Sequence, residues 1–123
     1  MLDHVSVPVR DLDRAGKFYD EVFQPLGLQR LVTSERTIGY GKRYPEFWLN
    51  YRASQHGVGD SGAHVALRAQ DTASVERFHA VAIAMGATDD GAPGERKAEM
   101  TGYFGAFIID HDGNKIEAVT FPR

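Results

Sequence analysis

The chain has 123 residues and a formal net charge of −3 at pH 7; 42% of its residues are hydrophobic and 25% are charged. This balance is typical of one soluble globular domain and argues against disorder. The sequence contains no cysteine, which excludes disulfide scaffolds, Cys-ligated zinc and thiol catalysis.

Localisation and partner class follow from what the chain lacks. No basic run favours nucleic-acid binding, and no apolar stretch approaches the roughly 20 residues that span a bilayer. The N-terminus has neither the charged nor the apolar region of a secretory signal. We therefore expect a cytoplasmic protein that binds neither a nucleic acid nor a membrane. The aromatic fraction of 11% fits either a core or a pocket.

The first half of the chain predicts one strand, one helix and then three strands. Residues 2–9 alternate between apolar and polar side chains, which predicts a strand covered on one face. Asp11 is placed to cap a helix whose apolar residues recur at steps of three and four, and Pro25 and Gly27 end that helix. Short strands are predicted at residues 28–33, 37–41 and 46–51.

The same order of elements returns after a linker at residues 53–62. A strand is predicted at 63–69, and Asp71 is placed to cap a second helix that ends at Gly86. Further strands are predicted at 87–89, 103–109 and 115–121, with a loop at 91–100 and a tight turn at 110–114.

Matching residues recur at nearly constant spacing in the two halves. His4 and His64, Asp11 and Asp71, and Phe18 and Phe78 are each separated by 60 positions. We therefore predict an α+β domain of two βαβββ modules, at residues 1–52 and 63–123.

Strand parity gives the predicted sheets one apolar face and one unusual polar face. The apolar face is expected to pack on the helices, and the opposite face carries His4, Trp48, His64, Arg68 and Glu117. Two imidazoles and one carboxylate form the ligand set of an open divalent-metal site. The other interpretation is a set of scattered polar residues on an exposed sheet face.

Nearly the whole chain resembles the vicinal oxygen chelate superfamily, which includes glyoxalase I, bleomycin-resistance proteins and extradiol dioxygenases. The residues that carry the resemblance are Leu2-Asp3-His4-Val5-Ser6-Val7-Pro8-Val9-Arg10-Asp11, Phe18-Tyr19, Pro25-Leu26-Gly27-Leu28, Gly62-Ala63-His64-Val65-Ala66-Leu67 and Asp110-His111-Asp112-Gly113-Asn114-Lys115-Ile116-Glu117. The resemblance implies that the two modules form a cup-shaped, mostly antiparallel eight-stranded sheet with helices on its outer face. It also implies a homodimer, since sites in small members are often built from modules of both chains.

The resemblance implies that His4, His64 and Glu117 hold a divalent metal ion, either Fe, Mn, Ni or Zn, with Glu117 also the candidate catalytic carboxylate. The fourth ligand place departs from the pattern, because alignment puts Trp48 where glyoxalase I carries a glutamate. Glu46 has the same parity and would fill that place only through a register shift. Some relatives bind no metal.

Six residues are predicted to line the ligand pocket. Trp48 is either a stacking wall or core, and Arg68 either holds an anionic group or is a solvated surface residue. The full set is Trp48, Asn50, Arg68, Tyr40, Tyr103 and Phe104.

Three hypotheses for the function remain open. The first is a small metal-dependent enzyme, of lyase, isomerase or dioxygenase type, whose substrate chelates the metal through neighbouring oxygens. The second is a metal-free protein that binds or sequesters a small molecule, as bleomycin-resistance proteins do. The third is a dimeric module whose cup-shaped sheet serves only to assemble the dimer.

Overall fold

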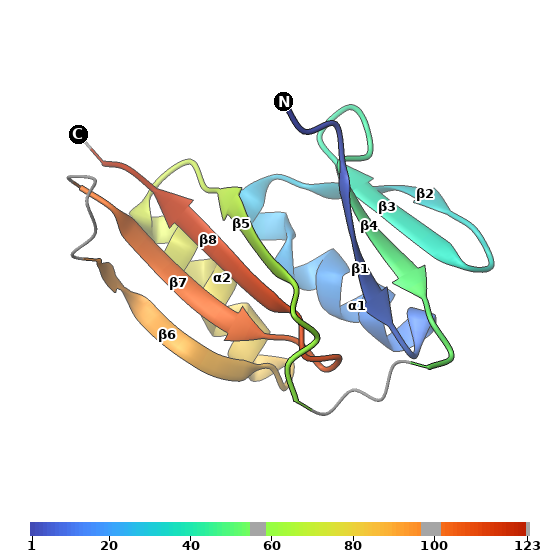
Figure 1. Ribbon diagram of the computed structural model, residues 1–123. Coiled ribbons are helices and arrows are strands. Elements are labelled where there is room, and N and C mark those ends of the chain that lie inside the picture. The colour runs from blue at the N-terminus through green and yellow to red at the C-terminus, as the bar shows by residue number, and fades with distance from the viewer. Residues whose placement is uncertain (55–58, 97–101, 123) are drawn as a thin grey trace.

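The computed structural model describes residues 1–54, 59–96 and 102–122, and it contains both expected modules (Figure 1). The elements of the first module are β1 (Val5–Val9), α1 (Leu12–Val22), the short 3-10 helix η1 (Gln24–Leu26), β2 (Gln29–Thr33), β3 (Thr37–Gly41) and β4 (Phe47–Tyr51). Those of the second are β5 (His64–Arg68), α2 (Thr72–Ala84), β6 (Thr88–Glu95), β7 (Phe104–Ile109) and β8 (Lys115–Thr120).

Both helices begin where the sequence predicts, and α2 ends just before Gly86, but α1 already ends at Val22, and Pro25 lies in the separate helix η1. Asp11 and Asp71 lie just before α1 and α2, and their carboxylates accept hydrogen bonds from the backbone amides of Arg14 and Ser74. These contacts satisfy amide groups that have no partner within the helix. After η1 and α2 the chain reverses at Gly27 and Gly86, with φ of 76° and 95°, a left-handed conformation that favours glycine.

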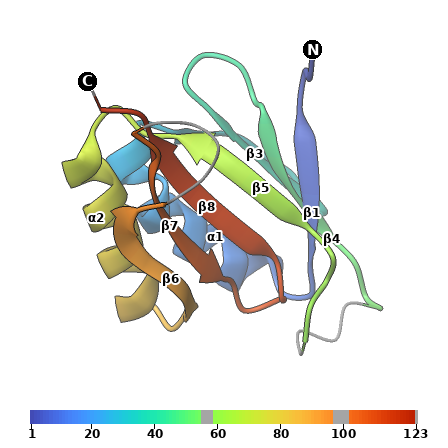
Figure 2. The same cartoon turned by 60° about the vertical axis from the view of Figure 1, so that its left-hand side comes forward.

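The eight strands form two four-stranded sheets with the same strand order, β1-β4-β3-β2 and β5-β8-β7-β6. In each sheet the first strand of the module is an edge strand and pairs in parallel with the last strand, β1 with β4 and β5 with β8. The remaining pairs are antiparallel. The helices cover one side of the sheets, α1 on the first and α2 on the second, and the two helices touch (Figure 2). The predicted α+β fold class is confirmed, and the opposite side of both sheets is left uncovered by helix.

The core lies between the helices and the sheets and follows the predicted strand parity. In the first module Val7, Val9, Phe47 and Leu49 are at most 1% exposed. In the second, the fully buried side chains are Val75, Phe78, Ala82, Ala106, Ile108, Ile116 and Ala118. The neighbouring residues of each strand therefore point to the open face.

The prediction of a loop at 91–100 is wrong for its first part. Strand β6 extends to Glu95, and it pairs with β7 through two register shifts around Gly91. Because β6 is an edge strand, Pro93 removes no ladder hydrogen bond from the sheet interior. Residues 97–100 lie outside the described part of the chain.

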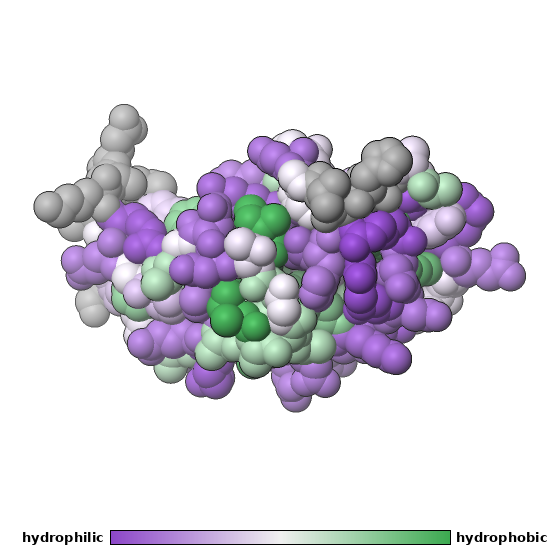
Figure 3. Space-filling view, turned by 90° about the horizontal axis from the view of Figure 1, so that it is seen from below, coloured by the Kyte–Doolittle hydropathy of each residue, from purple (hydrophilic) through white to green (hydrophobic). Residues whose placement is uncertain are grey.

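No helix within the described residues is both long and apolar enough to cross a membrane. Viewed from below, the molecule is covered mostly by polar side chains, with a band of apolar side chains near the middle of this face (Figure 3).

The turn between β7 and β8 joins the two modules through a buried carboxylate. Asp110 is 6% exposed and accepts four hydrogen bonds. Its Oδ1 accepts from the backbone amides of Asp112 (2.8 Å) and Asn114 (2.9 Å). Its Oδ2 accepts from the Tyr19 hydroxyl (2.6 Å) and the Asn114 side-chain amide (2.9 Å). Burial raises the pKa of Asp110, while the hydrogen bonds from Tyr19 and Asn114 oppose that rise.

The same turn also binds the end of β1. The Asp112 carboxylate accepts from the backbone amide (3.0 Å) and guanidinium (3.1 Å) of Arg10. That guanidinium also donates to the carbonyl of His111, and the Asn114 amide donates to the carbonyl of Pro8. The turn therefore fixes where the second module sits against the first.

We predict that Asp110→Asn destabilises the protein by about 1 to 3 kcal/mol. An amide has a single acceptor oxygen, so two of the four donors lose their partner in a buried place. Urea unfolding of the variant measures the loss. Asp13→Asn, an exposed change in the first turn of α1, is the control. Equal stability of Asp110→Asn and the unmodified chain would contradict the assigned role of the turn.

Candidate functional site

The open face of the first sheet carries Trp48 at its centre. In the parallel register Ser6 lies beside Trp48, and across the antiparallel pair Gly39 lies beside it. The indole is half-buried and extends over Gly39, where an added Cβ would lie 2.9 Å from Cζ3. Trp48 therefore faces the open side, as expected, and Gly39 leaves the room for its ring.

Register decides which residue stands at the fourth ligand place. In the second sheet Glu117 pairs with Ala66, two residues after His64, and in the first sheet Trp48 pairs with Ser6, two residues after His4. Trp48 is thus the counterpart of Glu117. Glu46 lies before β4 and is exposed, and its carbonyl pairs with Val5, so no register shift brings it to that place.

The open face of the second sheet brings His64 and Glu117 together. Glu117 is only 2% exposed, although its strand position faces away from α2. His64 Nε2 lies 2.9 Å from Glu117 Oε1, and the Tyr103 hydroxyl donates to Oε2. Phe107 lies opposite Glu117 on β7, and its ring centroid is 6.2 Å from that of His64. On this face His64, Glu117 and Tyr103 are therefore joined by side-chain contacts.

His4 does not join this pair within one chain. It is exposed, with Nδ1 2.7 Å from Asp3. Each histidine lies at the start of its strand, and β1 and β5 run in opposite directions (Figure 1), so the two residues lie at opposite ends of the open face. Asn114, the neighbour of Lys115, contacts Pro8, and Lys115 pairs with His64. Four strand residues, about 13 Å, separate Pro8 from His4.

The three predicted ligands therefore do not form one cluster within a single chain. Among residues 1–54, 59–96 and 102–122, no three His, Asp or Glu side chains are close enough to hold one metal ion.

Basic side chains and aromatic rings also lie on the second sheet. The Arg68 guanidinium stacks over the Phe121 ring at 4.8 Å, and none of the ion pairs formed by the described residues involves it. Lys115 lies 5.1 Å from the Phe107 ring centroid and 3.0 Å from Asp90. A surface hollow of about 480 Å³ adjoins this face, with His64, Asp90 and Lys115 among its lining residues.

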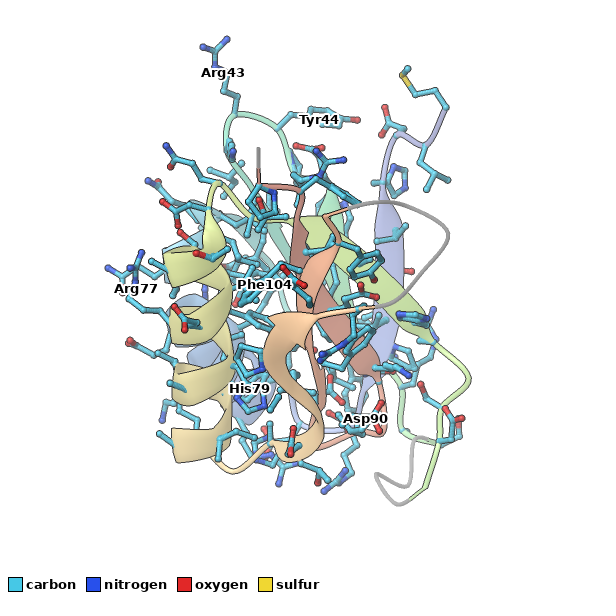
Figure 4. All side chains as sticks on the ribbon, turned by 90° about the vertical axis from the view of Figure 1, so that its left-hand side faces the viewer. Arg43, Tyr44, Arg77, His79, Asp90 and Phe104 are labelled. Atoms are coloured by element: carbon cyan, nitrogen blue, oxygen red, sulfur yellow. The ribbon has the colours of Figure 1, made fainter. Side chains whose placement is uncertain are left out.

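Two predicted pocket residues lie elsewhere. Tyr40 is fully buried under α1, and its hydroxyl donates to the Gly16 carbonyl (3.0 Å) and the Asp20 carboxylate (2.9 Å). Phe104 packs against the core on the α2 side of its sheet (Figure 4). Their strand parity assigns both side chains to the helix-covered face.

Asn50, Phe107 and Lys115 also stand on the open faces. Asn50 is half-buried on β4 between Pro8 and Thr37, on the Trp48 face. Phe107 was not predicted, although it has the same strand parity as Tyr103. Lys115 shares the strand parity of Glu117, and that parity predicts its place on the same face of β8.

Paired βαβββ modules with an open sheet face define the fold class of this protein. A sequence model of the Glyoxalase/Bleomycin resistance protein/Dioxygenase superfamily matches residues 1–118, and the chain belongs to that superfamily. None of the curated proteins matches this chain.

Solved structures with this fold include proteins of several activities. A glyoxalase/bleomycin resistance protein from Albidiferax ferrireducens T118 is 30% identical over 98% of both chains, with a TM-score of 0.86. A variant of the fosfomycin resistance protein FosX from Listeria monocytogenes, in complex with Mn(II) and 1S,2S-dihydroxypropylphosphonic acid, is 17% identical over 96% of this chain and 87% of its own, with a TM-score of 0.70. Lactoylglutathione lyase from Agrobacterium tumefaciens is 18% identical over 98% and 92%, with a TM-score of 0.69. The last two share the fold.

We predict that Tyr40→Phe lowers stability by about 0.5 to 1.5 kcal/mol for each hydrogen bond lost, and leaves ligand and metal binding unchanged. The removed hydroxyl donates to two groups of α1, the Gly16 carbonyl and the Asp20 carboxylate. Thermal unfolding measures the first effect, and Mn²⁺ binding measures the second. Weaker Mn²⁺ binding at unchanged stability would instead support the predicted role of Tyr40 in the pocket.

Proposed function

We propose that this protein is a homodimeric, metal-dependent enzyme whose small-molecule substrate binds a divalent cation through two neighbouring oxygens. The observation that carries the proposal is the contact of His64 Nε2 with Glu117 Oε1 at 2.9 Å, on a sheet face without a covering helix. Imidazole nitrogen and carboxylate oxygen that meet at one point are suitable ligands for one cation.

The donor set fits a divalent metal. A buried carboxylate is costly unless a positive charge or several hydrogen bonds compensate it. Within the described residues, no Arg or Lys forms an ion pair with Glu117. His64 and Tyr103 are its polar contacts there. A cation bound by His64 and Glu117 would supply the missing charge.

The third ligand would come from a second copy of the chain. His4 and His64 lie at the starts of β1 and β5, which run in opposite directions, so the described part of one chain offers two separate half-sites. A two-fold axis that brings β1 of one copy to β5 of the other would place His4 of a second copy beside His64 and Glu117. It would create two equal sites in the dimer, because a two-fold interface is self-complementary.

Each residue of the site then has a separate task. The metal, when bound, would act as a Lewis acid towards the chelating oxygens of the substrate. Glu117 would bind that metal as its carboxylate ligand. Arg68, stacked on Phe121 and without an acidic partner among the described residues, would bind an anionic group of the substrate. Trp48 and Asn50 would line the opposite wall of the cup.

The Mn(II) and dihydroxypropylphosphonic acid bound to the FosX variant agree with this proposal, since that ligand carries neighbouring hydroxyls and an anionic group. The identity of the metal would separate the reaction types. Iron or manganese favours oxygen-dependent chemistry, and nickel or zinc favours a lyase or isomerase.

One observation favours a second candidate, a metal-free protein that binds a flat small molecule. Trp48 occupies the place of the fourth ligand and presents a half-buried indole to the open face. Such a ring is a suitable surface for stacking.

Elemental analysis of protein purified without chelators tests the two candidates. We expect about one divalent metal ion per chain, and its loss in His64→Ala and Glu117→Gln. His79→Ala is the matched control. His79 lies on α2 (Figure 4), and its Nε2 contacts Asp89 instead. Metal-free protein that keeps its ligand binding in a His4→Ala/His64→Ala variant would overturn the enzyme proposal.

Mixing of variants tests the shared site. His4→Ala and His64→Ala each remove every site from their own homodimers. A mixed dimer regains one intact site, because His4 of the second variant meets His64 and Glu117 of the first. Random exchange should thus restore about a quarter of the wild-type metal content. No recovery after confirmed subunit exchange would show that the site does not combine two chains.

A further inference from the structure

The two oxygens of the Glu117 carboxylate have different partners. Oε1 lies 2.9 Å from His64 Nε2, whereas Oε2 accepts the hydrogen bond of the Tyr103 hydroxyl. The carboxylate is 2% exposed, so these contacts and not water determine its orientation. Only the Oε1 side is turned towards the histidine.

The fold holds Tyr103 in this position through two neighbours. Tyr103 comes directly before β7, and its ring extends back over Gly105. A Cβ on Gly105 would lie 3.0 Å from Tyr103 Cε1 and 3.6 Å from Glu117 Oε2. On the other side Phe121 packs edge-on against the Tyr103 ring, with centroids 5.5 Å apart. Gly105 has no positive φ, so the space that it leaves is the reason for its small size here.

A carboxylate held by a donor on one oxygen offers its other oxygen to a cation. Such outer contacts fix the direction of a metal ligand, and their loss typically costs 10- to 100-fold in metal affinity. We propose that Tyr103 is a positioning residue, which holds Glu117 so that Oε1 and His64 Nε2 converge on one metal ion while Oε2 is kept away from it. This inference rests on the proposed metal site and assigns Tyr103 a role other than substrate contact.

One-oxygen binding has a consequence for the substrate. A carboxylate that binds through both oxygens occupies two coordination positions, whereas one that binds through Oε1 alone occupies one. With two histidines this leaves further positions on a divalent metal for the neighbouring oxygens of a substrate. Tyr103 would thus keep the site open for a chelating ligand without touching the metal or the substrate.

Tyr103→Phe removes the hydroxyl and keeps the ring. We expect it to weaken Mn²⁺ binding by about tenfold or more, measured from the electron paramagnetic resonance signal of free Mn²⁺. The visible spectrum of the Co²⁺-loaded protein should also change, because the coordination of Glu117 changes. Tyr51→Phe is the matched control. Tyr51 is a half-buried tyrosine of the first sheet under Arg36, and its change should alter neither readout.

A second variant covers the case in which Tyr103→Phe does not fold. Gly105→Ala keeps the hydroxyl but pushes the Tyr103 ring from its place, and it should weaken Mn²⁺ binding in the same direction. Wild-type affinity and an unchanged Co²⁺ spectrum in both folded variants would overturn the role of Tyr103, while the metal site itself would stand if Glu117→Gln abolishes binding. Absence of Mn²⁺ and Co²⁺ binding in the wild-type dimer would overturn both proposals.

Discussion

The buried carboxylate of Asp110 is the contact on which the arrangement of the two modules depends. It accepts hydrogen bonds from its own turn and from the Tyr19 hydroxyl of α1. The end of the second module is therefore bound to the helix of the first. Arg10 adds a second link to the same turn through Asp112. An unsatisfied buried carboxylate is costly, which means that the modules cannot shift against each other without losing several of these hydrogen bonds together.

This junction has a direct consequence for the site. It holds the end of β1 beside the start of β8, and β8 carries Glu117 and pairs with His64. The same contacts leave His4 at the far end of β1. Each chain therefore presents one histidine–glutamate pair and one separate histidine, and the open faces remain uncovered by helix. Because the described residues of one chain bring no three such ligands together, the proposed third ligand comes from a second copy, and the proposed metal centre and the proposed dimer are one hypothesis.

Much of the fold was predictable because alternation and helical spacing are local properties. The caps at Asp11 and Asp71, the apolar strand faces and the repeat of the modules are all confirmed. Strand β6 was missed from Gly91 onward, because a segment with Gly91, Pro93 and Gly94 has little strand propensity and is held by its pairing with β7. Tyr40 and Phe104 were assigned to the pocket by residue type, although their parity assigns them to the core.

The sequence by itself determined the element order, the repeat and the side of each sheet to which His64, Trp48 and Glu117 point, since these follow from residue spacing along one strand. The tertiary structure decided what these side chains meet. Register between β1 and β4 identified Trp48, not Glu46, as the counterpart of Glu117. Pairing of distant segments brought Tyr103 to Glu117 and kept His4 away from His64. Such contacts join residues many positions apart, and no local pattern specifies them, because they depend on how complete sheets pack against one another.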